Sequence, residues 1–312
     1  MSNELPVFSP SSTKAFDFCP KKAMAEKQFG YTPTIADKAL QSRIAGSAFH
    51  VGAAVLHTHL YDTLNGTRIF GHLTSATAVK LAAIEIITQA IQAATLSFKA
   101  DYTAYISAGG IITDQDYQQG LDKVTAALKK YPFQTPVLRW ESITSIEDRL
   151  PEAGNCIIDT AGMNDEGIPI VADLKFSLSL ESYAITRRAQ SYKYDWGLYH
   201  YVWAKYPNQA CEAMIILVVA SPSFKIQTVS WDITPARQAA WLSNAGALWS
   251  RMAVERTLPL QQQREAATHA DMYGPCSLLR WCQDLQMEGT LPSDIIQVNW
   301  PKPVESQNDT KV

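Results

Sequence analysis

The sequence predicts a single α/β domain in which a central mixed sheet is flanked by helices, with a helical insertion near the N-terminus. Three observations support this fold class. Up to about residue 130 the chain is dominated by Ala-rich and apolar helical patterns. Its centre carries three β-rich stretches, "PVLRWESI", "NCIIDTAG" and "IPIVADLKF". A helical stretch and two more strands, "CEAMIILVVAS" and "FKIQTVSWDI", follow, and this order is typical of a sheet with helices packed on its faces.

The helices are predicted from their apolar periodicity and their start signals. Thr234 followed by Pro235 is a good start signal, because Pro is tolerated at the first helical position. The segment "SAGGII" divides the insertion into two helices. The predicted helices cover about residues 44–61, 75–105, 114–130, 181–204 and the segment that begins at Pro235.

No change of composition is sharp enough to divide the chain into independent domains. We therefore predict one domain over residues 1–290, which contains the helical insertion over residues 64–135. Residues 291–312 are predicted to be an extended, fraying tail.

The composition of the 312 residues is that of a soluble globular protein, with 46% hydrophobic and 18% charged residues. A net charge of −3 gives no support for nucleic-acid binding by bulk attraction, so such a role has to rest on local basic patches. No apolar run approaches the about 18 residues of a membrane span, and the segment "MSNELPVFSPSS" has no signal-peptide pattern. The five cysteines are odd in number and widely spread, which favours a reducing cytoplasm.

The stretch "GIPIVADLKFS" places two charges in an apolar strand. Asp173 and Lys175 are two residues apart, so their side chains point to the same face. The turn "MNDEG" makes a hairpin with the preceding strand, which brings Asp159 close to both. Two neighbouring carboxylates repel each other unless a cation lies between them, and Mg²⁺ favours carboxylate oxygens. The alternative is a buried Asp173–Lys175 salt bridge, with Asp159 capping a turn.

Three further patterns accompany this pair. "GSAFH" carries Gly46 and His50 in a predicted helix, "QSYKY" carries Gln190 and Tyr194, and "FSPSSTKAFDFCP" is a serine-rich start that ends in Cys-Pro. In this order, and together with Asp159 and "DLK", they resemble the RecB-like branch of the PD-(D/E)XK nucleases. The resemblance covers residues 9–20, 46–50 and 155–220, and hardly touches 64–135.

The resemblance implies a restriction-endonuclease-like domain that binds one or two Mg²⁺ or Mn²⁺ ions. Lys175 is then expected to position the attacking water and to stabilise the transition state, while Gln190 and Tyr194 orient the substrate. The implied metal ligands are His50, Asp159, Asp173 and the backbone carbonyl of Leu174.

Other polar residues have competing interpretations. Arg187 and Arg188 precede Gln190 on the predicted helix and either bind DNA phosphate or form a solvated face. Glu141 in "RWESI" is a further candidate to support the site from a neighbouring strand. His57, two turns after His50 on the same helix face, is assigned to packing.

The cysteines have two interpretations. Some RecB-like nucleases hold an iron–sulfur cluster with one N-terminal and three C-terminal cysteines, and Cys19, Cys276 and Cys282 match three of these positions. His269 is the nearest substitute for the fourth ligand. The alternative is that these cysteines are small buried hydrophobes, which is the interpretation we favour for Cys156 and Cys211.

The resemblance implies a metal-dependent deoxyribonuclease, an exonuclease that acts on a DNA single strand or duplex end in recombination, repair or replication. A helicase or recombination protein is the expected partner, in the cytoplasm of a bacterial or phage-infected cell. The insertion over 64–135 is expected to form a wall or an arch over the cleft. The competing hypothesis is a catalytically weak nucleic-acid-binding subunit of a helicase–nuclease complex.

Overall fold

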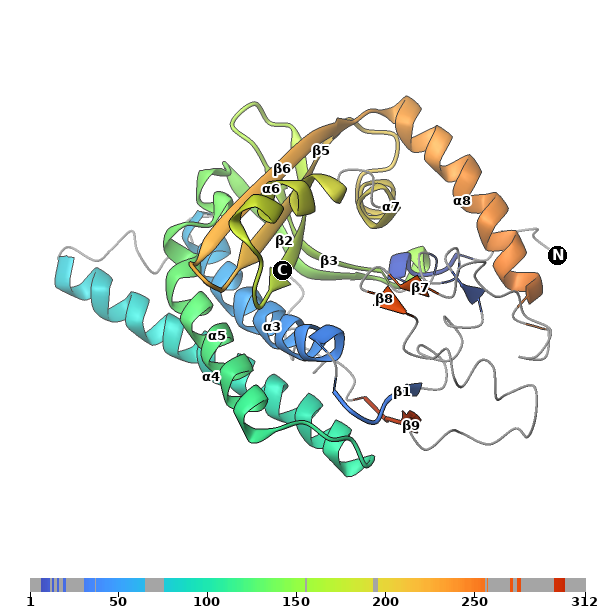
Figure 1. Ribbon diagram of the computed structural model, residues 1–312. Helices are drawn as coiled ribbons and strands as arrows, with labels where there is room; N and C mark the ends of the chain where they lie inside the picture. The colour runs from blue at the N-terminus through green and yellow to red at the C-terminus, as the bar shows by residue number, and fades with distance from the viewer. Residues whose placement is uncertain are drawn as a thin grey trace, which may run out of the picture.

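A computed structural model provides the fold, and it contains the predicted mixed sheet (Figure 1). Five strands lie in the order β2-β3-β4-β5-β6; β4 and β5 are parallel and the other neighbours are antiparallel. The strands are Ser142–Leu150 (β2), Cys156–Met163 (β3), Pro169–Ser177 (β4), Cys211–Val219 (β5) and Lys225–Ile233 (β6). The structure describes residues 7–11, 13, 16, 19–20, 31–36, 38–64, 76–154, 156–192, 196–255, 257, 270–271, 274–275 and 295–300.

The helices agree with the predicted ones except at two places. The first helix begins at Lys38 rather than near residue 44. The helix predicted over 181–204 is two helices, because the helical hydrogen-bonding pattern of the first ends at Ser191 and the second begins at Trp196. Thr234 and Pro235 do begin a helix. The helices are Lys38–Leu64 (α3), Ala76–Ser107 (α4), Asp114–Lys130 (α5), Ser182–Ser191 (α6), Trp196–Lys205 (α7) and Pro235–Glu255 (α8).

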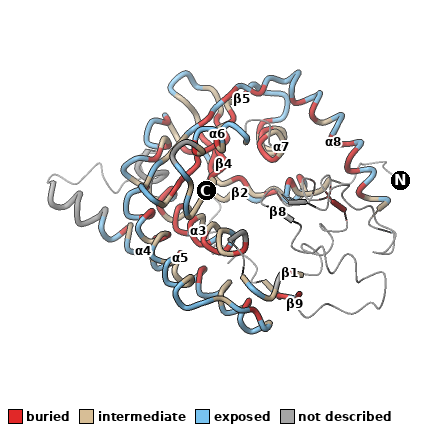
Figure 2. Tube along the Cα trace, in the orientation of Figure 1, coloured by how far each residue is buried: buried red, intermediate tan, exposed pale blue. Residues whose placement is uncertain are grey.

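Helices α3 and α7 cover opposite faces of the sheet. Along β4, Ile170, Ala172 and Leu174 belong to the core that α3 helps to form, whereas Val171 belongs to the core of α7. Successive strand residues point to opposite faces, so these two cores lie on the two sides of one sheet. The buried residues accordingly follow the strands and the inner sides of both helices (Figure 2).

The helical insertion forms an outer layer on α3. Helix α4 packs against α3 and α5, and Figure 1 shows both helices on the side of α3 away from the sheet. Thr113 caps the start of α5, where its side chain accepts a hydrogen bond from the Asp116 amide. The predicted arch over a cleft is therefore not seen in the described part of the insertion, which acts as a wall behind α3.

The first strand of the sheet begins later than predicted. The sequence favours a strand over "PVLRWESI", but Pro136–Arg139 forms a 3₁₀ helix and β2 begins at Ser142. Pro136 fixes its own φ angle and has no amide to donate, which suits the first turn of a helix better than a sheet ladder. Strand β2 therefore extends to Leu150 and includes residues to which the sequence assigns no strand.

The described part of the C-terminal segment, residues 295–300, is extended as predicted, but it is paired with another strand instead of fraying. Strand β9 (Ile295–Gln297) pairs with β1 (Tyr31–Pro33) in antiparallel register. Val298 is buried, and the Arg43 guanidinium lies 3.7 Å from the ring centroid of Trp300. These contacts fasten residues 295–300 to the start of the domain beside α3.

A third, smaller core lies between α7 and α8. It is built on Trp241 and Trp249 from α8, together with Phe16 from the N-terminal segment. A two-stranded ribbon, β7 (Ala270–Asp271) with β8 (Gly274–Pro275), completes the described strands. Among the described residues, none of the helices has the length and hydropathy that a membrane crossing requires.

Candidate functional site

The site begins where β3 and β4 separate. Their antiparallel ladder runs from Met163–Pro169 to Thr160–Ala172 and stops there. At the next position the Asp159 side chain replaces the main chain as partner, because its Oδ2 accepts a hydrogen bond of 2.6 Å from the Leu174 amide. Strand β4 meanwhile continues alongside β5 to Ser177. The opening of the ladder leaves Asp159 at the point where groups from neighbouring elements meet.

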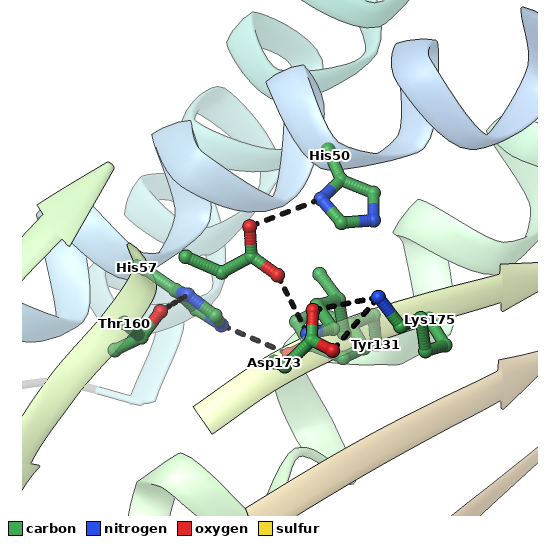
Figure 3. A network of polar contacts seen from close by, with 8 residues as sticks. His50, His57, Tyr131, Thr160, Asp173 and Lys175 are labelled. Carbon is green, nitrogen blue, oxygen red and sulfur yellow. Dashed lines mark hydrogen bonds and ion pairs between the residues drawn. The ribbon is translucent and has the colours of Figure 1, made fainter. Parts of the chain in front are cut away.

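His50 reaches Asp159 from α3. Its Nδ1 lies 3.4 Å from Asp159 Oδ1, and Figure 3 shows the imidazole projecting from the helix toward this network. Burial alone lowers the pKa of His50, but the charge and hydrogen bond of Asp159 outweigh burial, so the pKa is raised. For Asp159, burial alone raises the pKa, but His50, Lys175 and the Leu174 amide together lower it. The predicted approach of His50 to Asp159 is thus present.

Glu147 joins them from β2. One donor atom each from His50, Glu147 and Asp159 lies within 4.8 Å of the other two. Glu147 has a left-handed φ of 49° and lies between Ile146, which pairs with Thr160, and Asp148, which pairs with Ile158. Burial and the neighbouring Asp159 raise the pKa of Glu147 to about 7. Because burial and Asp159 both disfavour the charged form of Glu147, a cation bound between the two carboxylates would stabilise that form.

Glu147 was missed by the sequence-based prediction, which considered Glu141 instead. Glu141 is exposed and precedes β2, and its amide bonds to the Met163 carbonyl at the far end of β3. The available signal was the acidic pair Glu147-Asp148, which follows the β-rich stretch "PVLRWESI" by a few residues. Only the backbone irregularity at Glu147 turns one of these acids toward Asp159.

Asp173 and Lys175 form the predicted pair on β4. The Lys175 ammonium donates to both carboxylate oxygens of Asp173, at 2.9 Å and 2.7 Å. Asp173 is 4% exposed, and its carboxylate is not among the three converging donor groups of His50, Glu147 and Asp159. Metal ligation by Asp173 and by the Leu174 carbonyl therefore stays a prediction. The alternative that the sequence left open, a buried Asp–Lys ion pair, describes the contact that is present.

An aromatic ring links Lys175 to α6. The Lys175 ammonium lies 5.9 Å from the ring centroid of Tyr192, and the Arg188 guanidinium lies 5.2 Å from the same centroid. The ring of Tyr192 borders the α7 core. It also supports two cations on the side of β4 where Lys175 emerges.

The other residues predicted to bind the substrate from this helix do not contact the ion pair or lie outside the described residues. Gln190 and Arg187 lie on α6, and both are exposed to solvent. Tyr194 lies outside the described residues, so its role with Gln190 stays a prediction. Arg188 lies beside the Tyr192 ring that Lys175 also approaches.

His57 holds the sheet to α3. Its Nδ1 lies 2.6 Å from the Thr160 hydroxyl and its Nε2 lies 2.9 Å from the Tyr131 hydroxyl (Figure 3). The ring is 2% exposed, and burial lowers the pKa of His57 to about 4. His57 is therefore a neutral core histidine, as predicted, and it fixes the residue next to Asp159.

The described cysteines are all buried: Cys19, Cys156 and Cys211. Burial raises the pKa of the Cys156 and Cys211 thiols to about 12, which suits the predicted role of inert hydrophobes. Cys276, Cys282 and His269 lie outside the described residues. An iron–sulfur cluster on these residues and Cys19 stays a prediction.

The donor set of the site fits a divalent cation. Two carboxylates and one imidazole suit Mn²⁺ and Mg²⁺, and a cation placed among them relieves the repulsion between Glu147 and Asp159. His50, Glu147 and Asp159 are the residues that would hold the ion. No protein-family model matches the chain, and no curated protein matches it significantly. A functional assignment therefore has to come from this site and from the motifs.

Proposed function

We propose that the protein is a metal-dependent deoxyribonuclease that hydrolyses phosphodiester bonds at DNA ends. One observation carries the proposal: three donors from α3, β2 and β3 converge beside a buried Asp–Lys pair on β4. The resemblance of the motifs to RecB-like nucleases supplies the class of substrate. It also connects the protein with recombination, repair or replication, alongside a helicase or recombination protein.

Each group has a part that its position supports. His50, Glu147 and Asp159 hold the cation, which when bound supplies positive charge to stabilise the phosphate as it is attacked. Lys175 donates hydrogen bonds to a phosphate oxygen or to the attacking water. Asp173 holds the ammonium in place through both of its carboxylate oxygens.

The neighbouring cations suit a polyanionic substrate. Arg188 lies beside the Tyr192 ring, which Lys175 of β4 also approaches, and Arg187 is exposed on the same helix. A guanidinium donates to two phosphate oxygens at once, which makes α6 a phosphate-binding edge next to the site. This local patch compensates for the net charge of −3, which gives no general attraction for DNA.

The test is a digestion assay with end-labelled single strands, linear duplexes and closed circles, in Mn²⁺, Mg²⁺ or EDTA. Wild-type protein is compared with Asp159→Asn, which keeps the shape of the side chain but removes its charge. We expect cutting of linear DNA that needs the metal and falls by about 1000-fold or more in the variant.

Two outcomes would change the proposal. Digestion of closed circles would replace action at ends by endonuclease action. A folded wild-type protein that binds DNA but cuts none of the substrates with either metal would favour the accessory, nucleic-acid-binding role.

A further inference from the structure

A second polar and aromatic site lies on the other face of the sheet. A half-open pocket of about 440 Å³ lies between α7, β6 and α8, within the range of about 300–1,000 Å³ that small-molecule sites occupy. Its walls carry Trp196 and Tyr199 from α7, Trp231 from β6, and Arg237, Trp241 and Asn244 from α8. Trp231 belongs to the α7 core, so this pocket and His50 lie on opposite sides of the sheet.

The spacing of these residues along α7 and α8 puts them on the sides of the two helices that face the pocket. On α8, Arg237, Trp241 and Asn244 are spaced by four and three residues, which puts them on one side of the helix. On α7, Trp196 and Tyr199 are three residues apart and face the same way. Strand β6 is the edge of the sheet, so the pocket stays open to one side.

The aromatic wall is rigid. The Trp241 ring packs at 5.9 Å from Trp196, at 5.9 Å from Trp249 and at 5.4 Å from His200, measured between ring centroids. His200 is itself fixed, because its Nε2 lies 2.9 Å from the Ala153 carbonyl oxygen. A ligand thus meets rings that are already held in position, which lowers the entropic cost of binding.

Two buried donors in this wall have no acceptor. The indole nitrogens of Trp231 and Trp241 are buried, and neither has a hydrogen-bond partner in the described part of the chain. The two side chains belong to residues only 8% and 7% exposed. A buried donor without an acceptor is unfavourable, so an acceptor that a ligand brings to this wall favours binding.

The polar groups around the rings indicate the chemistry of the ligand. Arg237 is exposed and is oriented by one hydrogen bond, from Nη1 to the Asp232 carbonyl at 2.6 Å. Asn244 adds an exposed amide that both donates and accepts. Aromatic rings beside a guanidinium and an amide are the groups that bind a base by its π-face and edge, and its phosphate by charge.

We propose that the pocket between α7, β6 and α8 binds one nucleotide unit of a single-stranded nucleic acid. The base lies against the Trp196 and Tyr199 rings, and the phosphate binds Arg237. The choice of a nucleotide over another planar anion rests on the proposed nuclease function. The pocket would hold a strand on the face of the sheet opposite the proposed metal site.

The test measures binding without cleavage. Tryptophan fluorescence of the full chain is titrated with a short thymidine oligomer in EDTA, because stacking of a base quenches an indole. Wild type is compared with Trp196→Leu and Arg237→Gln, two variants at the rim of the pocket. Arg251→Gln, exposed on the same helix outside the pocket, is the matched control.

We expect saturable quenching in the wild type and in Arg251→Gln. Trp196→Leu should bind about tenfold more weakly, and Arg237→Gln should bind more weakly with a shallower dependence on salt. Absence of quenching, or equal affinity in all four proteins, overturns the proposal. Quenching by a proline-rich peptide and none by the oligomer would overturn it in favour of a peptide groove.

Asp159→Asn separates this proposal from the nuclease. The variant should keep the quenching, because the pocket does not use the metal site. Quenching that depends on Arg237 in a protein that cuts no DNA would support the pocket and reject the nuclease. Cutting without quenching would do the reverse.

Discussion

The two faces of the sheet differ in how they bury polar groups. At the opening between β3 and β4, charges are gathered and matched: His50 from the α3 side with Asp159, and Lys175 with Asp173 on β4. On the α7 face, an aromatic wall buries the neutral indole nitrogens of Trp231 and Trp241, and neither has a hydrogen-bond partner among the described residues. Concentrated charge suits chemistry on a phosphate, whereas rings and weak donors suit holding a flat ligand.

The largest contrast is between two lysines that each bind an aspartate. Lys175 binds Asp173 beside the metal donors, and Lys205 on α7 binds Asp148 on β2. Lys175→Ala should lower the rate of DNA cleavage by about 100- to 1000-fold, because it removes a charge from the transition state. Lys205→Ala should leave the rate within about threefold, since an ion pair of this kind contributes about 1 kcal/mol or less. Equal losses in a single-turnover assay would show that the two pairs have one structural role.

Acid should weaken both faces through one histidine on each. Burial lowers the pKa of His57 on the α3 face and of His200 on the α7 face to about 4, against 6.5 in the unfolded chain. Between about pH 6.5 and pH 4 the two imidazoles bind protons in the unfolded chain but not in the folded chain. The stability that the neutral histidines contribute is therefore complete above about pH 6.5. It is lost as the pH falls toward 4, at up to about 1.4 kcal/mol per pH unit for each histidine.

Denaturant unfolding in EDTA between pH 7 and pH 4 measures this effect. His200→Gln should be less stable at pH 7. Between about pH 6.5 and pH 4 it should take up about one proton fewer on unfolding than the wild type, so its unfolding free energy should depend less steeply on pH. The total contribution of each histidine is about 3 kcal/mol. A pH dependence that is the same in wild type and variant would mean that His200 is already charged in the folded protein.

Two glutamates test which residues bind the ion. Glu147→Gln should weaken Mn²⁺ binding by about 10- to 100-fold, measured as the rise in melting temperature with added metal. Without metal the same variant should melt slightly higher, because the repulsion with Asp159 is gone. Glu141→Gln is the control and should change neither value. If Glu141→Gln alone weakened binding, the ligand assignment would move to the residue favoured by the sequence.

The smallest effects concern single hydrogen bonds, one on each face. Tyr131→Phe removes the hydroxyl that binds His57 Nε2, and Thr13→Val removes the acceptor of the Trp249 indole. Each leaves a buried group without a partner and should cost about 1–3 kcal/mol of unfolding free energy. Urea titration of the two variants and wild type measures both costs. A cost only for Tyr131→Phe would mean that the α8 side tolerates unpaired donors more easily.

The sequence predicted well how residues close together in the chain are placed. It predicted only in part which distant residues meet at the site. Asp173 and Lys175 meet because a strand repeats every two residues, which is a local rule. The approach of His50 to Asp159 came from the resemblance of the motifs, since no local rule joins residues so far apart. Glu147 was out of reach because its role depends on a left-handed backbone and a ladder that opens beside it.

In the fold, too, local features were predicted and features that depend on tertiary packing were missed. The helices of the insertion follow from periodicity, and their bounds agree with the prediction closely. The division of residues 181–204 into α6 and α7 was missed, since the sequence there continues an apolar and aromatic pattern without Gly or Pro before Trp196. Helix α6 contacts β5 and β6 whereas α7 contacts β4 and β5, and a sequence pattern does not record such packing.

The pairing of β1 with β9 has a consequence for how the protein is made. Tyr31–Pro33 leaves the ribosome early, and its partner Ile295–Gln297 follows only after the whole sheet has been synthesised. Closing so long a loop is slow, and Trp300 cannot reach Arg43 before then. Helix α3, which carries His50, therefore gains the contacts of residues 295–300 only after these residues have been translated. A chain stalled before residue 295 lacks these contacts.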